Sequence, residues 1–263
     1  MARNSLRNVF NLIEQAKESQ SAEQSFLLDL KRSIELTDEK NRRKPSKTYK
    51  PSSMNCIRNM WFQVTGQEPD KSTSSACLVG ICESGTDRHE RIQNAVSDMK
   101  KNGIDCEYID VAKFVKSRNL DYLDVVSRQG NETKLYNRSL NMSFLCDGII
   151  RYKGKYYILE IKTESIYKWS TRTGVNESHH TQAISYSVSL GLDDVIFLYI
   201  NRDNTDMKAF MFQVNNEMKE ELIGKIESCD EYVKKLTCPP KPETATAKFC
   251  QYCDYKNSCK RNV

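Results

Sequence analysis

The clearest pattern along the chain is a pair of apolar segments separated by a short polar turn. Residues 144–152 and 156–163 are rich in β-branched and aromatic side chains, and Lys153-Gly154-Lys155 lies between them. Two apolar segments joined by a short glycine-containing turn are typical of a β-hairpin. We therefore predict a hairpin in the middle of the chain.

Other segments show helical or strand periodicity. Helices are predicted over residues 3–36, 85–102, 177–190 (ended by Gly191) and 216–236, and strands over 106–111, 133–136, 195–200 and 209–214. This mixed order predicts an α/β fold with a central mixed β-sheet flanked by helices.

The first third of the chain contains a break in this pattern. Residues 37–53 are polar and basic and contain prolines, which is typical of a linker or a long surface loop. We therefore expect a helical N-terminal extension with a basic linker over residues 1–50 and a main domain over residues 51–263.

Composition narrows the classes of protein. With 263 residues and 38% hydrophobic content, the chain can form one elaborated domain with a core. No apolar run approaches the roughly 20 residues needed to cross a bilayer, and the N-terminus lacks the apolar stretch of a signal peptide. We expect a cytoplasmic protein without a membrane partner. Its net charge of +5 permits nucleic-acid binding without requiring it.

Charged residues interrupt the apolar strands of the hairpin, where an unpaired charge is unfavourable. Glu160 and Lys162 are two residues apart and project from one face of a strand, while Leu159 and Ile161 face the other way. Asp147, on the partner strand, can reach the same region. An isolated Glu-x-Lys is more often an exposed edge-strand feature, but the apolar context favours a functional site.

Two carboxylates beside one ammonium group suit Mg²⁺ or Mn²⁺, which prefer oxygen ligands. Such an ion polarises a phosphate and lowers the pKa of a bound water. Lys162 can orient that water or neutralise developing charge. The hairpin therefore indicates phosphodiester cleavage.

Two further positions fit either a site or a core. The helix after the hairpin places His179, Gln182 and Tyr186 on one face. Gln182 and Tyr186 can contact phosphate, water or a base, or Tyr186 can pack in the core with its hydroxyl bonded. His89 also fits a satisfied core histidine. Tyr167 and Trp169 can stack on unpaired bases, although simple packing is the commoner role.

Cysteine spacing suggests a metal clamp at the C-terminus. Six of the ten cysteines are scattered and are expected to be free thiols in a reducing compartment. The others include the tight cluster Cys250-x2-Cys253-x5-Cys259. Thiolates suit either a [4Fe-4S] cluster or Zn²⁺.

The order of these motifs resembles the RecB-type branch of the PD-(D/E)xK nucleases. The similarity is to its iron-sulfur members, such as the CRISPR-associated RecB-like nucleases and the AddB recombination subunit. It extends from about Pro51 to Cys259 and rests on Cys56, Gly85-x3-His89, Asp147-Gly148, Glu160-Ile161-Lys162-Thr163, Gln182-x3-Tyr186 and Cys250-x2-Cys253-x5-Cys259. Each motif is weak alone, whereas their order and spacing are specific.

The resemblance implies a restriction-endonuclease-like α+β fold and a role for each matched residue. The implied metal ligands are His89, Asp147, Glu160 and the Ile161 carbonyl; Lys162 is the implied catalytic lysine, and Gln182 and Tyr186 help to position DNA. Glu132 matches an acidic residue found upstream of the core in some relatives. The proline that usually precedes the first acid is replaced by Cys146.

The same resemblance makes Cys56 the fourth ligand beside Cys250, Cys253 and Cys259, and favours iron-sulfur over zinc. Joining residues 56 and 250 closes a loop of most of the main domain. By analogy with disulfides, this closure contributes roughly 4 to 5 kcal/mol to stability. We therefore expect the cluster to staple the fold and to take no part in the chemistry.

Two functions from different classes follow. The first is a metal-dependent DNA exonuclease that acts on single strands or DNA ends in recombination, replication or repair. The second is a catalytically silent DNA-binding or assembly module docked on a helicase or other replication protein, and the first fifty residues motivate it. The intact set of catalytic residues favours the first. An RNase or a sequence-specific restriction endonuclease is less favoured, because no separate recognition domain is evident.

Overall fold

The computed structural model describes residues 21–41, 45–70, 75–129, 132–241, 250 and 253–261. Within them the chain divides into two compact units. The first contains residues 21–41 and 75–83, and the second contains residues 45–70 and the described residues from Ser84 onward. No helix in the described part of the chain has both the length and the apolar content needed to cross a membrane.

The first unit is helical. It contains α2 (Ala22–Asn41) and the beginning of α4 (Ala76–Asp98), and the Glu35 carboxylate accepts a hydrogen bond of 3.2 Å from the backbone N–H of Ala76. The predicted helix over residues 3–36 is found from Ala22 onward and continues to Asn41. Its earlier part lies outside the described residues.

The segment expected to be a linker is partly ordered and buried. Within residues 37–53, α2 continues to Asn41, and Tyr49 and Pro51 are buried in the second unit. The Tyr49 hydroxyl donates to Asp230 Oδ1 at 2.6 Å, and Tyr49 forms a β-bridge with Met142. Residues 37–41 therefore continue a helix and Tyr49 is fixed by partners far along the chain, which differs from the linker or surface loop expected there. The division of the chain at residue 50 stays a prediction.

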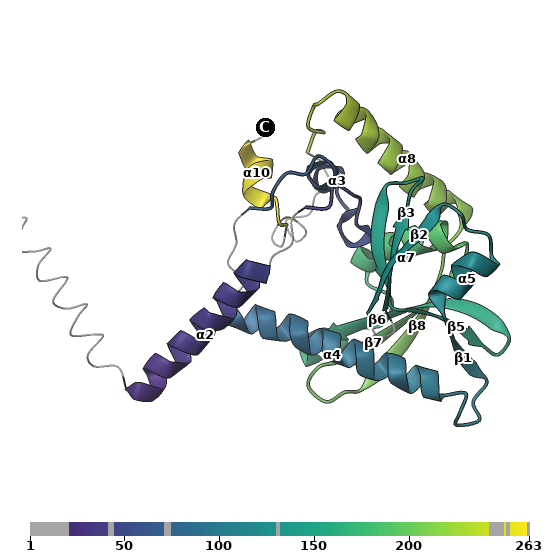
Figure 1. Cartoon of the computed structure of the whole chain (residues 1–263), viewed down its shortest axis with the longest axis horizontal. Helices are drawn as coiled ribbons and strands as arrows, with labels where there is room; N and C mark the ends of the chain where they lie inside the picture. Colours follow the sequence, from purple (N-terminus) through teal and green to yellow (C-terminus); the bar gives the residue numbers. More distant parts are fainter. Residues whose placement is uncertain are drawn as a thin grey trace, which may run out of the picture. The chain divides into compact units, whose positions relative to one another are not determined.

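The second unit contains a five-stranded sheet in the order β1-β5-β6-β7-β8. Its strands are β1 (Cys106–Ile109), β5 (Gly148–Tyr152), β6 (Lys155–Glu164), β7 (Asp194–Asn201) and β8 (Met207–Gln213). Strands β6 and β7 are parallel and the other neighbours are antiparallel. With helices beside it (Figure 1), this sheet confirms the predicted fold of a central mixed sheet flanked by helices.

The predicted hairpin is formed by β5 and β6. Lys153 and Gly154 have φ values of 49° and 78°. Positive φ at both central residues is the requirement of a type I′ turn, which suits the twist of a two-residue hairpin. The hairpin is confirmed, with β6 long enough to carry Glu160 and Lys162 past the end of β5.

The part of the chain between β1 and β5 forms a second sheet, which has three antiparallel strands. It consists of β2 (Leu123–Gln129), β3 (Glu132–Asn137) and β4 (Met142–Cys146) in that order. Asp147 alone separates β4 from β5. Asp147 is therefore not on a hairpin strand, as the sequence suggested, but at the point where the chain passes from one sheet to the other.

Helices precede, follow and connect the strands of the second unit. They are the 3₁₀ turn η1 (Pro51–Ser53), α3 (Ile57–Val64), the later part of α4, α5 (Val111–Ser117), α6 (Ile166–Ser170), α7 (Glu177–Leu190), α8 (Asn216–Lys234) and α10 (Lys256–Arg261). Helix α7 matches its predicted range and ends at Gly191, which has a φ of 65°. This left-handed C-terminal position favours glycine.

Successive side chains of β6 belong alternately to two apolar clusters. Leu159 and Ile161 pack with Ile92 and Val96 of α4. Ile158 belongs to the larger cluster. That cluster also includes side chains of α7 and α8, and Met54, which directly follows η1. Since Glu160 and Lys162 share the face of Ile158, both are directed toward the α7 side of the sheet.

Candidate metal and catalytic site

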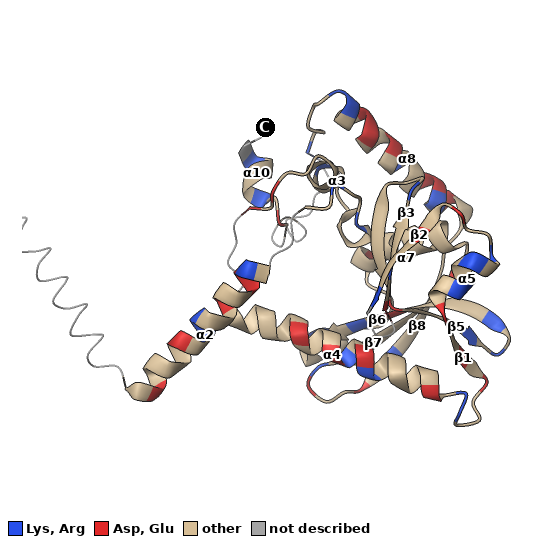
Figure 2. Cartoon of the chain, in the orientation of Figure 1, with Lys and Arg blue, Asp and Glu red and all other residues tan. Residues whose placement is uncertain are grey.

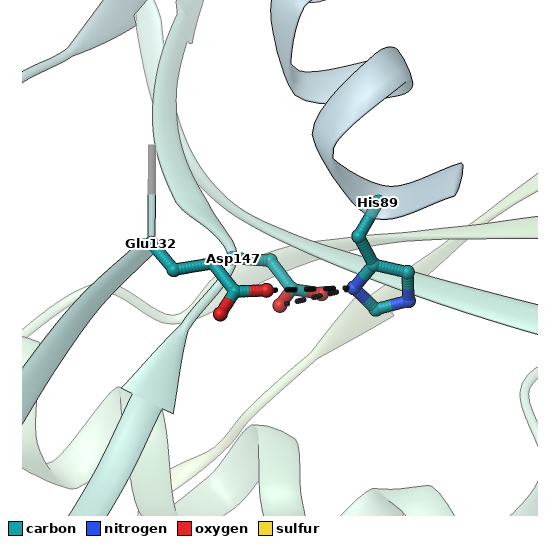
Figure 3. Close-up of side chains that lie close together, drawn as sticks. All are labelled: His89, Glu132 and Asp147. Atoms are coloured by element: carbon teal, nitrogen blue, oxygen red, sulfur yellow. Dashed lines mark ion pairs between the residues drawn. The ribbon is translucent and has the colours of Figure 1, made fainter. Parts of the chain in front are cut away.

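Three side chains from distant parts of the sequence converge in the second unit. They are His89 on α4, Glu132 at the start of β3, and Asp147 between β4 and β5 (Figure 3). One ligand atom from each lies within 4.8 Å of the others. His89 Nδ1 is 3.5 Å from Asp147 Oδ1 and 3.9 Å from Glu132 Oε1. An imidazole and two carboxylates at this spacing suit a divalent cation.

Asp147 is held at both its carboxylate and its backbone carbonyl. Carboxylate Oδ2 accepts from the backbone N–H of Ile161 at 2.7 Å. The carbonyl oxygen accepts from Gln93 Nε2 at 2.8 Å and from the Tyr108 hydroxyl. Gln93 is only 1% exposed, so its amide is committed to this contact. The break between the two sheets is therefore fixed by hydrogen bonds from α4, β1 and β6.

The residue after Asp147 has to be small. A Cβ atom added to Gly148 would lie 2.6 Å from the Tyr108 hydroxyl oxygen and 2.7 Å from the nearest ring carbon. The glycine thus allows Tyr108 to reach the Asp147 carbonyl.

Glu160 lies beside this group and has one uncommitted oxygen. The residue is 2% exposed, and Oε1 accepts from Lys162 Nζ at 2.5 Å and from Gln182 Nε2 at 2.6 Å. Oε2 is buried and has no hydrogen-bond partner among the described residues. A buried carboxylate oxygen without a partner is costly, and a bound cation would satisfy it. Glu160 therefore fits the ligand role implied for it.

A chain of hydrogen bonds next to Glu160 connects Lys162, Gln182 and Tyr186. Lys162 Nζ donates to Gln182 Oε1 at 2.8 Å, and Gln182 Nε2 also lies 2.7 Å from the Tyr186 hydroxyl. That hydroxyl donates to the Leu145 carbonyl at 2.7 Å. Tyr186 is buried and its ring packs against Phe144. The structure thus shows the core-packing alternative for Tyr186, with its hydroxyl bonded inside the protein.

Burial and charge shift the pKa values of these groups. Burial, followed by the charge of Asp147, raises the pKa of Glu160 to about 7. The same two causes raise the pKa of Glu132. Burial lowers the pKa of Lys162, but the Glu160 carboxylate more than offsets this, so the pKa lies above its usual value. Clustered, perturbed carboxylates are common at functional sites and favour cation binding.

His89 belongs to the same electrostatic group. Burial lowers its pKa, while the hydrogen bond and charge of Asp147 and the charge of Glu160 raise it, with a net upward shift. The imidazole faces the carboxylates of Asp147 and Glu132, so its hydrogen-bonding capacity is satisfied at a position that also suits a cation ligand.

The structure brings together most of the residues singled out from the sequence. His89, Asp147, Glu160, Lys162 and Gln182 form one constellation. Ile161 contributes its backbone N–H to Asp147, and the ligand role implied for its carbonyl stays a prediction.

Three residues of the site were not predicted, or were predicted only weakly, from the sequence. Glu132 belongs to the three-residue cation group, although its match to the upstream acid was weak. Gln93 was missed, but it is one helical turn after His89 and so shares its face, which is a usable signal. Tyr108 gave no signal, because its contact depends on the pairing of β1 with β5.

Among the predicted cysteine ligands, Cys56 and Cys259 lie near Cys253 in the second unit. Burial raises the pKa of the Cys253 thiol, and the nearby Cys56 and Cys259 act in the same direction. The backbone N–H of Cys253 bonds to the Cys250 carbonyl at 3.4 Å. Cys56 and the C-terminal segment, almost two hundred residues apart, therefore meet.

Two side chains of α3 donate to the sulfur atoms. Arg58 Nη1 donates to Cys259 Sγ at 3.3 Å, and Asn59 Nδ2 lies 3.9 Å from Cys253 Sγ. Hydrogen-bond donors around thiolate sulfurs are typical of metal–sulfur sites. Thiolates suit a [4Fe-4S] cluster or Zn²⁺ on ligand chemistry. The group of possible metal ligands that lies close together in the described residues is His89, Glu132 and Asp147, so the cysteine site stays a prediction.

Comparisons with known proteins give structural likeness only. No protein-family model matches the chain, and no curated protein matches it in sequence. Among solved structures, the crystal structure of SSO0001 aligns with a TM-score of 0.47 and 13% identity, covering 90% of this chain and 98% of that one. An alkaline exonuclease from Laribacter hongkongensis, LHK-Exo, aligns with a TM-score of 0.41 and 12% identity, covering 73% and 94%. Likeness at this level does not establish a shared activity, so function has to come from the residues of this chain.

Proposed function

We propose that this protein is a Mg²⁺- or Mn²⁺-dependent DNA nuclease of the restriction-endonuclease-like type, with residues 51–263 as its nuclease domain. We further propose an exonuclease that acts on single strands or DNA ends in recombination, replication or repair. The observation that carries the proposal is the partnerless, buried Oε2 of Glu160 beside the His89–Glu132–Asp147 group. A cation site explains why the carboxylates of Glu132, Asp147 and Glu160 lie so close together.

Each residue of the constellation has a role in this proposal. His89, Asp147 and Glu160 hold the cation, with Glu132 as an additional ligand on the His89 side. When bound, the cation polarises the scissile phosphate and activates a water for attack. Lys162, fixed by Glu160 and Gln182, orients that water and neutralises charge that develops on the phosphate.

Gln182 and Tyr186 act through Lys162. Gln182 bridges the lysine and the buried Tyr186 hydroxyl, so it restricts the rotamers of Lys162. Tyr186 in turn is anchored on the Leu145 carbonyl, next to the strand end that leads to Asp147. In this proposal both residues hold the catalytic lysine in place.

The cysteines have a structural role in this proposal. Cys56, Cys250, Cys253 and Cys259 hold a [4Fe-4S] cluster, with zinc as the less favoured alternative. The cluster supplies cross-linking between α3 and the C-terminal segment and takes no part in hydrolysis.

A second candidate function has its own support. Helix α2 has no buried residue, and Phe26 is 67% exposed with Leu27, Leu28 and Leu30 also exposed on the same helix. An apolar surface of this kind suits association with another protein. In this alternative the chain is a catalytically silent DNA-binding or assembly module docked on a helicase or another replication protein.

The test is an assay of the cluster-loaded protein, purified anaerobically, on end-labelled single-stranded DNA with Mn²⁺. Asp147→Ala and Lys162→Ala should each lower the rate of label release by at least about 100-fold. Lys235→Ala, which removes an exposed lysine at the end of α8, is the matched control and should cleave normally. Cleavage by both site variants at the wild-type rate would rule out Asp147 and Lys162 as parts of a nuclease site.

The same preparation discriminates the second candidate. A protein that binds DNA and never cleaves it, and that loses a replication partner when residues 1–50 are removed, would be the assembly module. Binding in either case should weaken with salt, because phosphate contacts release counterions.

A further inference from the structure

Helix α6 follows the strand that carries Glu160 and Lys162, and three contacts anchor it. The backbone N–H of Ile166 donates to Asp203 Oδ2 at 2.7 Å. The Trp169 indole donates to the Tyr199 carbonyl at 3.3 Å. Lys208 Nζ lies 4.2 Å from the centre of the Trp169 ring and donates to the Trp169 carbonyl at 2.9 Å. The helix is therefore fixed to β7 and β8 by its Trp169 side.

The other side of α6 faces solvent. Tyr167 is 81% exposed and Ile166 is 52% exposed. The Tyr167 carbonyl accepts from the hydroxyls of Ser170 and Thr171 at 3.1 and 3.3 Å, so its backbone is fixed. An aromatic ring is thus presented to solvent from an ordered support, three residues after the end of β6.

Tyr199 of β7 connects this helix with the catalytic lysine. It is the register partner of Lys162 on β6, and its carbonyl accepts from the Trp169 indole of α6. Its hydroxyl lies 2.9 Å from His179 Nδ1 on α7, the helix that also carries Gln182. Arg172 is neutralised by Glu164 through contacts of 2.6 Å at both carboxylate oxygens, whereas Lys168 on α6 is exposed.

We propose that α6 is a binding surface for unpaired nucleotides, in which the Tyr167 ring stacks on a base and Lys168 contacts the adjoining phosphate. The proposal rests on the proposed nuclease function and deepens it, because it makes single-stranded DNA the preferred substrate. Every base has a face that can stack on an aromatic ring, whereas bases within a duplex are already stacked. Lys168 supplies a charge that matches the backbone.

The test is DNA binding without cleavage, in the Asp147→Ala background. Fluorescence anisotropy is measured with a labelled oligothymidylate and with a duplex of equal length. Tyr167→Ala should weaken binding of the single strand by about 5- to 100-fold, the range expected for losing one stacked base. Tyr167→Phe should retain binding, because the ring is kept. Tyr232→Ala, at a half-exposed tyrosine on α8, is the control and should bind normally.

Three results would overturn the proposal. They are unchanged single-strand binding by Tyr167→Ala, an equal loss for single strand and duplex, and loss of binding in Tyr167→Phe. These differ from failure of the nuclease function itself, in which the protein with intact Asp147 cleaves neither DNA, whatever its binding. A thermal unfolding curve for each variant verifies that it is folded.

Discussion

The burial of Glu160 opposes the ionised state that its carboxylate needs in order to bind a cation. Its carboxylate is needed in ionised form for a cation, yet it is buried with one partnerless oxygen. Burial and the Asp147 charge raise its folded-state pKa from 4.5 to about 7. Because the folded state then binds a proton more tightly than the unfolded state, stability must decrease as pH rises.

The first prediction is therefore a pH dependence of the metal-free protein. In EDTA, the free energy of unfolding should fall as pH rises from about 4.5 through about 7, and Mn²⁺ should reverse most of the loss at the upper end. Urea unfolding at several pH values, with and without Mn²⁺, measures this. In Glu160→Gln the decrease should be smaller, and an identical pH profile in this variant would contradict the assignment.

The second prediction concerns Gln93, whose amide fixes the Asp147 carbonyl. Gln93→Leu keeps the side-chain volume but removes this hydrogen bond. Mn²⁺ affinity should fall about 10- to 100-fold, as is typical when a group that orients a metal ligand is lost. Isothermal titration calorimetry measures the affinity directly, independent of catalysis.

Ser97→Ala is the control for Gln93, since Ser97 lies one turn further along α4 and bonds only to the Gln93 carbonyl in the contacts shown. It should bind Mn²⁺ as the unmodified protein does. Tyr108→Phe, which removes the second donor to Asp147, should weaken binding in the same direction as Gln93→Leu. Normal affinity in both would show that the carbonyl contacts do not position Asp147.

Three residues of the site were predictable because each is a polar exception in an apolar segment of the sequence. Asp147, Glu160 and Lys162 stand out in this way. Their spatial relations were not predictable, because Asp147 lies at a junction of two sheets. Glu132 joins it only through the pairing of β3 with β4, a contact that no local pattern encodes.

At the scale of elements, the junction between the sheets depends on close packing of β1 and β5. The third prediction is that Gly148→Ala destabilises the protein by about 1 to 3 kcal/mol, because the new methyl group would overlap the Tyr108 ring. The urea unfolding midpoint measures the loss. Gly224→Ala on α8 is the control, since nothing lies within 4 Å of the added Cβ, and it should be neutral or stabilising.

A double variant tests the cause of that destabilisation. If the Tyr108 ring is responsible, Gly148→Ala should cost much less in a Tyr108→Ala background, because contacting residues are not additive. Equal costs in the two backgrounds would place the strain elsewhere.

Elements with strong local signals were predicted and elements without them were not. Helix α7 has an Asn176 cap that accepts from Ser178 and a left-handed Gly191, and the β5–β6 turn has Gly154. The short helices α3 and α5 and strand β2 were missed. Their few residues carry little periodicity, and long-range packing decides their structure.

At the scale of the whole molecule, the net charge of +5 is a small difference between 40 basic and 35 acidic residues. Figure 2 shows Asp and Glu interspersed with Lys and Arg along α4 and α8. In the proposed function, DNA affinity would therefore come from local groups such as Lys162 and Lys168, and it should be modest and sensitive to salt.

The proposed cysteine site belongs to this largest scale, because it would join α3 to the C-terminal segment. Arg58 shows the same connection in protein contacts alone: its Nε donates to the Pro239 carbonyl at 2.7 Å and its Nη1 to the Cys259 carbonyl at 3.2 Å. In the proposed function, four cysteine ligands would add a link across a loop of nearly two hundred residues, and by analogy with disulfides closing such a loop would contribute roughly 4 to 5 kcal/mol.

The fourth prediction is that Cys56→Ser lowers the free energy of unfolding by several kcal/mol and reduces the bound metal, because it opens that loop. Anaerobic urea unfolding, with iron, sulfide and zinc content measured on the same samples, checks both effects. Cys77→Ser is the control, since Cys77 is an exposed thiol of the first unit and should change neither quantity. If Cys56→Ser keeps its full metal content and stability, Cys56 is not a ligand. If the metal is lost while stability is unchanged, the cluster is bound but does not staple the fold, and the Arg58 contacts suffice to hold the C-terminal segment.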